Sequence, residues 1–171
     1  MIKILVNDGI EADGKMLLEE AEYEVDTNRV DQADLPKVLP QYDVIIVRSA
    51  TQVRKDLIDQ CPNLKVIARG GVGMDNIDVD YARSKGIAVI NTPAASTRSV
   101  AELAMSHIYA LSRHIHHSKA EMVSGKSDFK KLKSTFSKGR ELAGKTMGII
   151  GFGRIGQEVA KLAMGANMRI L

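Results

Sequence analysis

One stretch near the end of the chain, residues 145–166, limits the possible folds more than any other. It reads as a short apolar run, residues 146–150, then Gly151-Phe152-Gly153-Arg154-Ile155-Gly156, then a helical pattern that ends near Gly165. A G-x-G-x-x-G pattern between a strand and a helix is typical of dinucleotide-binding folds, because the glycines permit a tight turn, close approach of a pyrophosphate and close helix packing. The sequence therefore predicts a buried strand, a helix whose N-terminus faces phosphates, and a dinucleotide site.

The chain ends soon after this motif. A dinucleotide fold usually supplies an acidic residue about 20 positions further on, where it binds the ribose hydroxyls. No acidic residue follows Glu158, and only the start of a second strand fits before Leu171. We therefore expect the sequence to be the N-terminal part of a longer protein. The choice between NAD and NADP cannot be made from these residues.

The first 95 residues alternate short apolar runs with short helical patterns. Strands are expected at residues 2–6, 23–26, 43–47, 64–68 and 87–90. Continuous Val and Ile runs separated by helices indicate a parallel sheet that is covered on both faces. The predicted fold class is α/β: a flavodoxin-like parallel-sheet domain, followed by the start of a Rossmann dinucleotide-binding domain. The first domain lacks a glycine fingerprint, so we expect it to bind the substrate.

Two of these predicted strands end in residues suited to an anion. Arg48 and the residues to Thr51 follow one strand, and Arg69 opens a glycine-rich segment, residues 69–76, after the next. Ligands of open parallel sheets bind beyond the carboxyl ends of the strands, and successive glycine N–H groups can form an anion-binding nest. We predict a carboxylate or phosphate site here, although glycine-rich turns and surface arginines also occur without ligands. Asp75 is expected to cap the next helix.

A longer helix is predicted after Pro93. Ser99 and Glu102 have the spacing of a capping box, and we expect a linking helix over about 99–118, preceded by a hinge at residues 94–99. Its predicted apolar face consists of Val100, Leu103, Ala104, Ile108, Leu111 and Ile115. The four histidines on this segment, His107, His114, His116 and His117, lack suitably spaced further ligands, so neither a metal site nor a catalytic role is predicted for them.

The net charge of +3 comes from one local segment. Residues 126–145 contain seven cations and two anions, and we interpret them as a solvated surface loop, with attraction of phosphorylated substrates or nucleic acid as the alternative. Only Phe129 and Phe136 could stack on bases there, so no nucleic-acid partner is predicted. The single cysteine, Cys61, excludes a disulfide framework and favours a cytoplasmic location. No apolar run approaches membrane length, so no membrane partner is predicted.

The chain resembles the D-isomer-specific 2-hydroxyacid dehydrogenases. The motifs that carry the resemblance, in family order, are residues 47–51, 68–76, 91–93, 99–103 and 148–156. The resemblance implies a substrate-binding domain at 1–95 and a truncated nucleotide-binding domain at 96–171 that binds NAD. It also implies oxidation of 3-phosphoglycerate to 3-phosphohydroxypyruvate, the entry to serine biosynthesis. A glyoxylate or hydroxypyruvate reductase, an NAD-sensing corepressor of the same fold, and a nucleic-acid binder using residues 126–140 stay open as alternatives.

The resemblance also implies roles for particular residues. The substrate-binding residues would be Arg48, Ser49, Ala50, Arg69, Gly70 and Gly71, with Arg48 and Ser49 at the anionic end and the amides of the two glycines on the carboxylate. The cofactor-binding residues would be Val72, Gly151, Gly153, Arg154, Ile155 and Gly156. Val72 and Ser96 depart from the Thr and Asn that are frequent in the family, which weakens side-chain contacts at both positions. The catalytic Arg, Glu and His are expected beyond Leu171, so the 171 residues alone should be inactive. A homodimer joined through the nucleotide-binding domain is expected.

Overall fold

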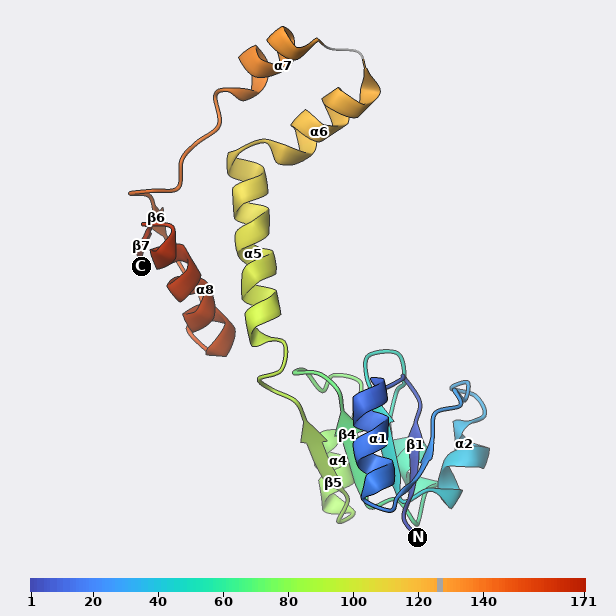
Figure 1. Ribbon diagram of the computed structural model, residues 1–171. Helices are drawn as coiled ribbons and strands as arrows, with labels where there is room; N and C mark the ends of the chain where they lie inside the picture. The colour runs from blue at the N-terminus through green and yellow to red at the C-terminus, as the bar shows by residue number, and fades with distance from the viewer. Residues whose placement is uncertain (126–127) are drawn as a thin grey trace. The chain divides into compact units, whose positions relative to one another are not determined.

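A computed structural model describes residues 1–125 and 128–171 (Figure 1). The chain divides into two compact units, Met1–Ala95 and Ser96–Leu171. None of the helices in the described ranges is long and apolar enough to cross a membrane. Lys126, the first cation of the basic segment, lies outside the described residues.

The first unit is built on a parallel sheet with the strand order β2-β1-β3-β4-β5. Its strands are β1 (Lys3–Val6), β2 (Glu24–Asp26), β3 (Val44–Val47), β4 (Val66–Arg69) and β5 (Ala88–Asn91). Its helices are α1 (Ala12–Glu20), α2 (Leu35–Val38), the 3-10 turn η1 (Leu39–Gln41), α3 (Lys55–Asp59) and α4 (Val79–Ser84). This order is the flavodoxin-like one, so the predicted fold class is confirmed. The predicted strands are shifted by at most two residues at either end.

The core of the first unit lies on one face of this sheet. Pairing between neighbouring strands places Leu5, Ile45, Ile67 and Val89 in one row across four strands. These side chains are buried together with apolar residues of α2, η1, α3 and α4. Because side chains alternate between the faces of a strand, a run such as Val-Ile-Ile-Val supplies both faces at once. Because this row of side chains is buried, it fixes the pairing register of the strands and therefore the position at which each strand ends.

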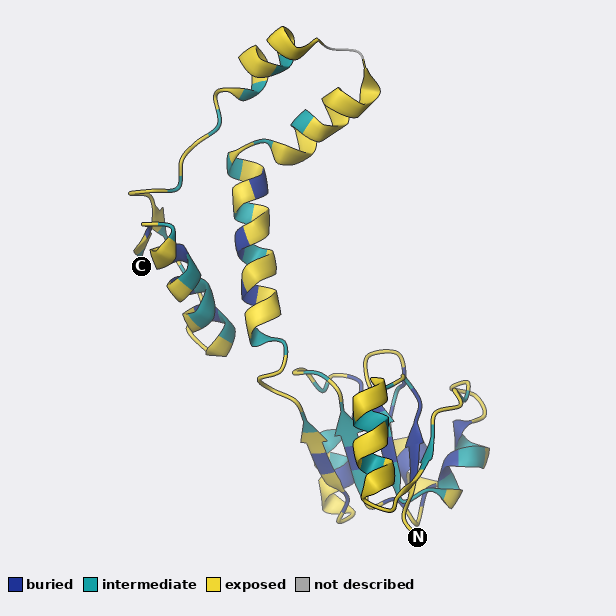
Figure 2. Ribbon diagram, viewed as in Figure 1, coloured by how far each residue is buried: buried dark blue, intermediate teal, exposed yellow. Residues whose placement is uncertain are grey.

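The opposite face of the sheet is only partly covered. A second row, formed by Val6, Ile46, Ala68 and Ile90, lies on this face. The last three of these residues line a cleft together with Ile10 and Glu11, which lead into α1 (Figure 1). Val6 is fully buried, but Ile90 is 57% exposed. No residue of α1 itself is buried, and Figure 2 shows the helix largely in the colour of exposed residues. The exposed end of this row becomes the floor of a cleft described below.

The second unit consists of helices and a two-stranded parallel sheet. Its elements are α5 (Thr97–Ser112), α6 (Ile115–Ser124), α7 (Phe129–Phe136), β6 (Thr146–Met147), α8 (Arg154–Gly165) and β7 (Arg169–Ile170). Its small core joins Met105 of α5 to Ala163 of α8 and to Met168. Arg98 at the start of α5 also forms an ion pair with Glu158 of α8, with 2.5 Å between Nη1 and Oε1. These contacts fix α8 against α5.

The single linking helix predicted at 99–118 is wrong in its bounds. The helix begins at Thr97, so Ser99 lies inside it, and Glu102 accepts from Arg98 at 2.6 Å instead of closing a capping box. It ends at Ser112 because His114 has a left-handed backbone with φ 58°. The break is supported by distant residues: Arg140 N donates to the carbonyl of Ser112 at 2.8 Å.

Three further predictions about the second unit need correction. The predicted apolar face of the linking helix is right for Ile108, which packs on the core, but wrong for Leu103 and Leu111, which are exposed. The buried residues of the helix are Ala101, Met105 and Ala110. The basic segment is not wholly a loop, because α7 forms within it. The strand predicted at 146–150 is shortened to Thr146–Met147.

Candidate substrate and cofactor sites

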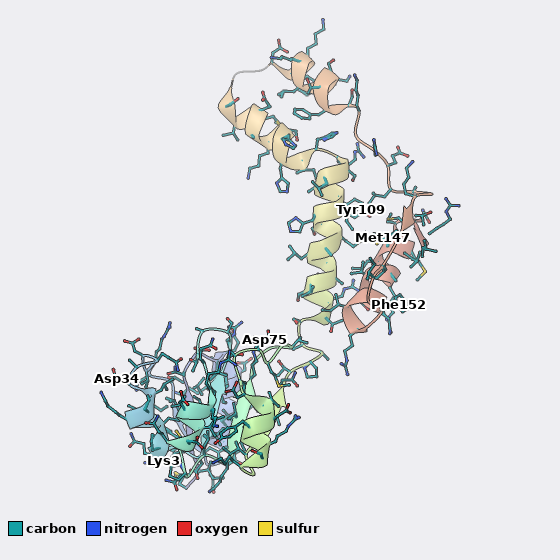
Figure 3. The ribbon with its side chains drawn as sticks, turned by 180° about the vertical axis from the view of Figure 1, so that it is seen from behind. Lys3, Asp34, Asp75, Tyr109, Met147 and Phe152 are labelled. Atoms are coloured by element: carbon teal, nitrogen blue, oxygen red, sulfur yellow. The ribbon has the colours of Figure 1, made fainter. Side chains whose placement is uncertain are left out.

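A cleft of about 420 Å³ opens at the carboxyl ends of four strands in the first unit. Its apolar floor is the exposed part of the second row, Ile46, Ala68 and Ile90, with Ile10 beside it. Its polar lining comes from residues that end the strands or follow them: Glu11, Arg48, Arg69, Asn91 and Thr92. Figure 3 shows the direction in which the strands run, because Lys3 at the start of β1 and Asp75 beyond β4 lie at opposite ends of the unit. The cleft therefore lies where parallel sheets bind their ligands.

A second cavity, of about 460 Å³, lies beside it at the ends of β1 and β3. In the strand order found here this is the switch point, where connections leave the sheet in opposite directions. The lining residues are Asn7, Asp8, Gly9, Thr27, Arg29, Arg48, Ser49 and Ala50. Arg48 lines both cavities, so its side chain is within reach of ligands in either of them.

Asp8 holds the Arg48–Thr51 segment in place. One carboxylate oxygen accepts from the amides of Arg48 at 2.7 Å and Thr51 at 3.1 Å, and the other accepts from the hydroxyl of Thr51 at 2.6 Å. Partial burial, the largest single influence, raises the pKa of Asp8, but the hydrogen bonds from Thr51, Arg48 and Ala50 together outweigh it and lower the pKa below its ordinary value. The carboxylate therefore stays ionised inside a site that is otherwise cationic.

The lowered pKa of Asp8 gives a prediction about acid stability. A carboxylate with a depressed folded-state pKa stabilises the fold above its unfolded pKa, and that contribution is lost as the pH falls through the folded-state value. Asp8→Asn should cost about 1 kcal/mol of unfolding free energy at pH 7. The difference in unfolding free energy between wild type and Asp8→Asn should become smaller as the pH falls below about 4. Urea unfolding of both chains from pH 7 to pH 3 measures this, and a gap that is independent of pH would contradict it.

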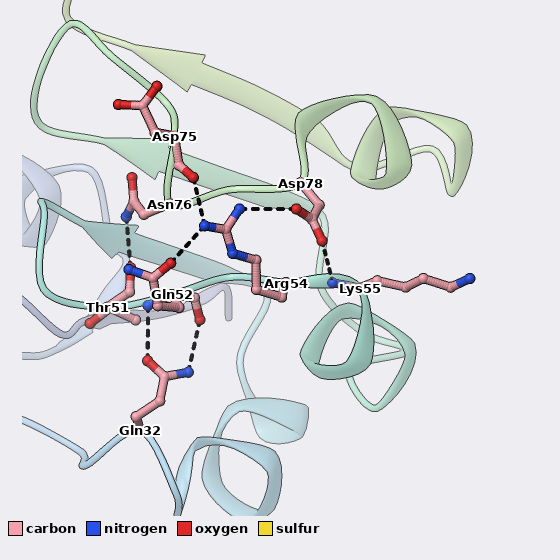
Figure 4. A network of polar contacts seen from close by, with 8 residues as sticks. All are labelled: Gln32, Thr51, Gln52, Arg54, Lys55, Asp75, Asn76 and Asp78. Atoms are coloured by element: carbon pink, nitrogen blue, oxygen red, sulfur yellow. Dashed lines mark hydrogen bonds and ion pairs between the residues drawn. The ribbon is translucent and has the colours of Figure 1, made fainter.

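Asn76 links the two loops that line the cleft. Its side-chain amide donates to the carbonyls of Arg48 at 3.0 Å and Thr51 at 2.6 Å, and its Oδ1 accepts from Nε of Arg69 at 3.0 Å. The backbone carbonyl of Asn76 also accepts from the amide of Val53. Figure 4 shows Asn76 beside Thr51 within a wider polar network. Asn76 is buried and so is its bond to the carbonyl of Thr51, so that carbonyl depends on Asn76 for a partner.

The glycine-rich loop after β4 differs from the open nest that the sequence predicts. The amide of Gly70 donates to the carbonyl of Val47 at 2.9 Å, and that of Gly71 donates to the carbonyl of Arg69 at 2.9 Å. Both amides are thus engaged within the chain. Among the described residues, the amides of Val72 and Gly73 have no such partner. The loop is attached to β5, because Asn91 Nδ2 donates to the carbonyl of Val72 at 2.7 Å.

Asp75 does not cap the helix that follows it, so that expectation was wrong. The residue before α4 is Asp78, whose carboxylate accepts from the amide of Lys55 at 2.8 Å and from Arg54 at 3.0 Å. Arg54 also donates to the backbone carbonyl of Asp75, as Figure 4 shows. These bonds fix the backbone of the loop at Asp75 and leave the Asp75 side chain exposed.

The glycine-rich turn of the second unit lies between β6 and α8. Gly151 has a left-handed φ of 96°, which favours glycine, and Gly156 packs so closely on the carbonyl of Gly151 that a Cβ would collide with it. Gly153 precedes the helix, and no side chain caps its first turn. Arg154 is exposed beside this helix start, whereas Ile155 is partly buried. Figure 3 labels Met147, the last residue of β6, and Phe152, which lies within the turn. An uncapped helix start that glycines leave open fits a pyrophosphate.

The predicted site residues thus fall into two groups, one in each unit. Arg48, Ser49, Ala50, Arg69 and Gly70 line the cavities of the first unit, whereas Gly71 follows Gly70 on the loop and lines neither cavity. Gly151, Gly153, Arg154, Ile155 and Gly156 form the turn of the second unit. Val72 lies on the loop of the first unit with an exposed side chain. None of the groups of His, Cys, Asp and Glu among the described residues could hold a metal ion.

Sequence reasoning missed Asp8, Asn76 and Arg29. The signal for Asp8 was present, because it lies two positions beyond the predicted strand 2–6, where parallel sheets gather their functional side chains. Asn76 is farther from its strand, and Arg29 follows a strand of only three residues. The position of Asn76 or of Arg29 relative to its strand does not predict that the residue lies at the site.

The fold and the two sites define an α/β protein with a substrate-type cleft in a flavodoxin-like unit and a Rossmann-type dinucleotide turn. The sequence model described as "D-isomer specific 2-hydroxyacid dehydrogenase, catalytic domain" matches residues 4–167. The chain belongs to this family.

Curated relatives and solved structures agree with that assignment. A hydroxypyruvate reductase of Thermotoga maritima is 47% identical over 99% of this chain and 54% of its own length. A D-3-phosphoglycerate dehydrogenase of Methanocaldococcus jannaschii is 46% identical over 100% of this chain and 32% of its own. The NAD-dependent formate dehydrogenase of Staphylococcus aureus, solved in complex with NAD, is 30% identical with a TM-score of 0.81, over 99% of this chain and 55% of its own. The chain therefore spans about a third to a half of the curated relatives' length.

Proposed function

We propose that the protein is an NAD-dependent D-3-phosphoglycerate dehydrogenase, which transfers a hydride from C2 of the substrate to the nicotinamide. The main observation in support is the pair of cavities that share Arg48 at the ends of the strands. A substrate with a carboxylate at one end and a phosphate at the other needs cationic or amide groups at both ends, and these cavities provide them. The relative from Methanocaldococcus jannaschii supports the same substrate.

The described residues are assigned to binding and orientation. Arg48 and Ser49 would hold the anionic end of the substrate, and the loop from Arg69 to Val72 would hold the carboxylate and border the nicotinamide. NAD would place its pyrophosphate against the first turn of α8, near Arg154 and Ile155, and the complex of the formate dehydrogenase with NAD supports this cofactor. When bound, NAD supplies the acceptor for the hydride.

Turnover by the full-length gene product tests the proposal. With NAD, kcat/KM for 3-phosphoglycerate should exceed that for D-glycerate and for glycolate by at least ~10-fold. This factor corresponds to the loss of one charge-assisted hydrogen bond of about 1.5–3 kcal/mol in substrates that lack the phosphate. Equal or better turnover of the unphosphorylated acids would reject 3-phosphoglycerate as the substrate.

A hydroxypyruvate reductase is the second candidate. The relative from Thermotoga maritima carries that name and is as similar as the phosphoglycerate dehydrogenase. A small unphosphorylated acid would occupy only the cleft beside Arg69 and leave the second cavity to solvent. Reduction of hydroxypyruvate with NADH, together with no oxidation of 3-phosphoglycerate, would favour this candidate.

We further propose a cytoplasmic homodimer joined through the second unit. Cys61 is buried and unpaired, which suits a reducing compartment. On α5, Leu103 and Leu111 are 57% and 71% exposed, whereas Ala101, Met105 and Ala110 of the same helix are buried. Two large aliphatic side chains on one exposed helix favour a partner surface.

The dimer can be tested on this helix. Leu103→Glu together with Leu111→Glu should convert a dimer to a monomer, because two charges would be buried at the interface. Sedimentation of the full-length gene product at several concentrations measures the change. Leu17→Glu, at an equally exposed leucine of α1, is the matched control and should leave the mass unchanged. A monomeric wild-type protein would contradict the proposal.

A further inference from the structure

We infer that Arg29 determines substrate specificity by forming, with Arg48, a two-arginine clamp for a phosphate monoester in the switch-point cavity. The inference rests on the proposed function and deepens it. It assigns the two anionic ends of the substrate to different cavities, the carboxylate to the cleft beside the Arg69 loop and the phosphate to the cavity lined by Thr27, Arg29 and Ser49.

The backbone on both sides of Arg29 is fixed. Asn28 N donates to the carboxylate of Asp26 at 2.8 Å, which closes the turn after β2. Val30 N donates to Oδ1 of Asn7 at 2.7 Å, and Nδ2 of Asn7 donates back to the carbonyl of Val30 at 3.0 Å. Asn7 is buried and also lines the cavity. Arg29 is therefore held at the cavity by a local turn and by a buried asparagine, rather than lying on a free loop.

The two guanidinium groups have no partner within the described part of the chain. Arg54 and Arg98 form ion pairs with acidic residues, but neither Arg29 nor Arg48 forms an ion pair or a side-chain hydrogen bond in the described ranges. A guanidinium presents five N–H donors in a planar fork that matches the oxygens of a phosphate. Two such forks at one cavity suit a dianion better than the single charge of a carboxylate.

The remaining groups of the cavity agree with an anionic ligand. Asp8 is its one carboxylate among the described lining residues, and its oxygens already accept from the Arg48–Thr51 segment. The hydroxyls of Thr27 and Ser49 are exposed at the same cavity and can donate to further phosphate oxygens. The lining is therefore cationic and rich in donors, with its one negative charge turned toward the backbone.

Binding of inorganic phosphate to the 171-residue chain tests the clamp directly. Chemical-shift titration should show that Arg29→Gln raises the phosphate Kd by ~10-fold, because a charge-assisted contact is lost, whereas Arg29→Lys should raise it less. Arg83→Gln is the control, since Arg83 is an exposed arginine of α4 that lines neither cavity. Equal phosphate affinity in wild type and Arg29→Gln would overturn the clamp, as would equal losses in the Arg29 and Arg83 variants.

Turnover measurements distinguish a failure of the clamp from a failure of the proposed function. In the full-length gene product, Arg29→Gln should raise KM for 3-phosphoglycerate by ~10-fold while kcat and the kinetics with D-glycerate stay near wild type. If the wild-type protein does not oxidise 3-phosphoglycerate but its phosphate binding still depends on Arg29, the proposed function fails and the clamp stands. If 3-phosphoglycerate is the substrate and its KM does not respond to Arg29→Gln, the clamp fails and the proposed function stands.

Discussion

Gly153→Ala should remove most of the NAD affinity of the full-length gene product without unfolding it. An added Cβ at Gly153 would meet no atom of the protein within 4 Å, and its backbone is extended, with φ −78° and ψ −162°. The methyl group would instead occupy the space in front of the first turn of α8, where the pyrophosphate is proposed to lie. Loss of one or two hydrogen bonds to a charged group corresponds to about 3 kcal/mol, or roughly 100-fold in Kd.

Two neighbouring glycines provide controls with different expected results. Gly148→Ala should change neither stability nor affinity, because its Cβ also meets nothing within 4 Å and Gly148 lies before the turn. Gly156→Ala should lower both, because its Cβ would collide with the carbonyl of Gly151 and push α8 away from β6. Calorimetric NADH titration and thermal unfolding measure the two effects. Unchanged NADH affinity in Gly153→Ala would place the pyrophosphate elsewhere.

Local sequence patterns predicted the sheet well because one row of buried side chains, Leu5, Ile45, Ile67 and Val89, sets the register of four strands. Runs such as Val44–Val47 place Ile45 and Val47 in the core on one face and half-buried Val44 and Ile46 on the other, and such continuous apolar runs are typical of parallel sheets. The glycine turn was equally readable, because Gly151 and Gly156 are required by backbone conformation and packing within a few residues. Both features depend on short stretches of chain, which is the information that a single sequence carries.

The helix after Pro93 was less predictable because distant residues end it. Nothing near Ser112 excludes a longer helix, and residues 113–118 include no proline or glycine. The break depends on Arg140, which bonds to the carbonyl of Ser112, and on Phe136, whose ring lies 6.3 Å from that of His114. Likewise, the apolar stripe suggested Leu103 and Leu111 as core residues, yet the smaller side chains of Ala101 and Ala110 are the buried ones on α5.

The polar framework of the candidate site was hidden for the same reason. Asp8 bonds to residues about 40 positions away, and Asn76 to residues 25 and 28 positions away. Only the pairing of β1 with β3 and of β3 with β4 makes these residues neighbours. The sequence could therefore indicate that Arg48 lies at a strand end, but it could not indicate what holds Arg48 there.

Asn76→Ala should be among the most destabilising single changes in the first unit. The substitution would remove the donor from the buried carbonyl of Thr51 and from the partly buried carbonyl of Arg48, and it would free the guanidinium of Arg69. Each buried group left without a partner costs about 1–3 kcal/mol, so we expect a loss of about 3–4 kcal/mol in the free energy of unfolding. Urea unfolding followed by circular dichroism measures this loss on the 171-residue chain.

Two further variants separate the hydrogen bonds from the loss of side-chain volume. Asn76→Asp keeps the size but replaces the donor amide with a carboxylate that faces two carbonyl oxygens, so it should destabilise the unit at least as much as alanine at pH 7. Asn63→Ala is the matched control, because Asn63 is exposed and donates a single bond to the carbonyl of Pro40 at 3.0 Å. That change should cost less than about 1 kcal/mol. If the Asn76 and Asn63 variants lost similar amounts, the two loops would be held together by something other than Asn76. Their joint positioning of Arg48 and Arg69 would then need a different explanation.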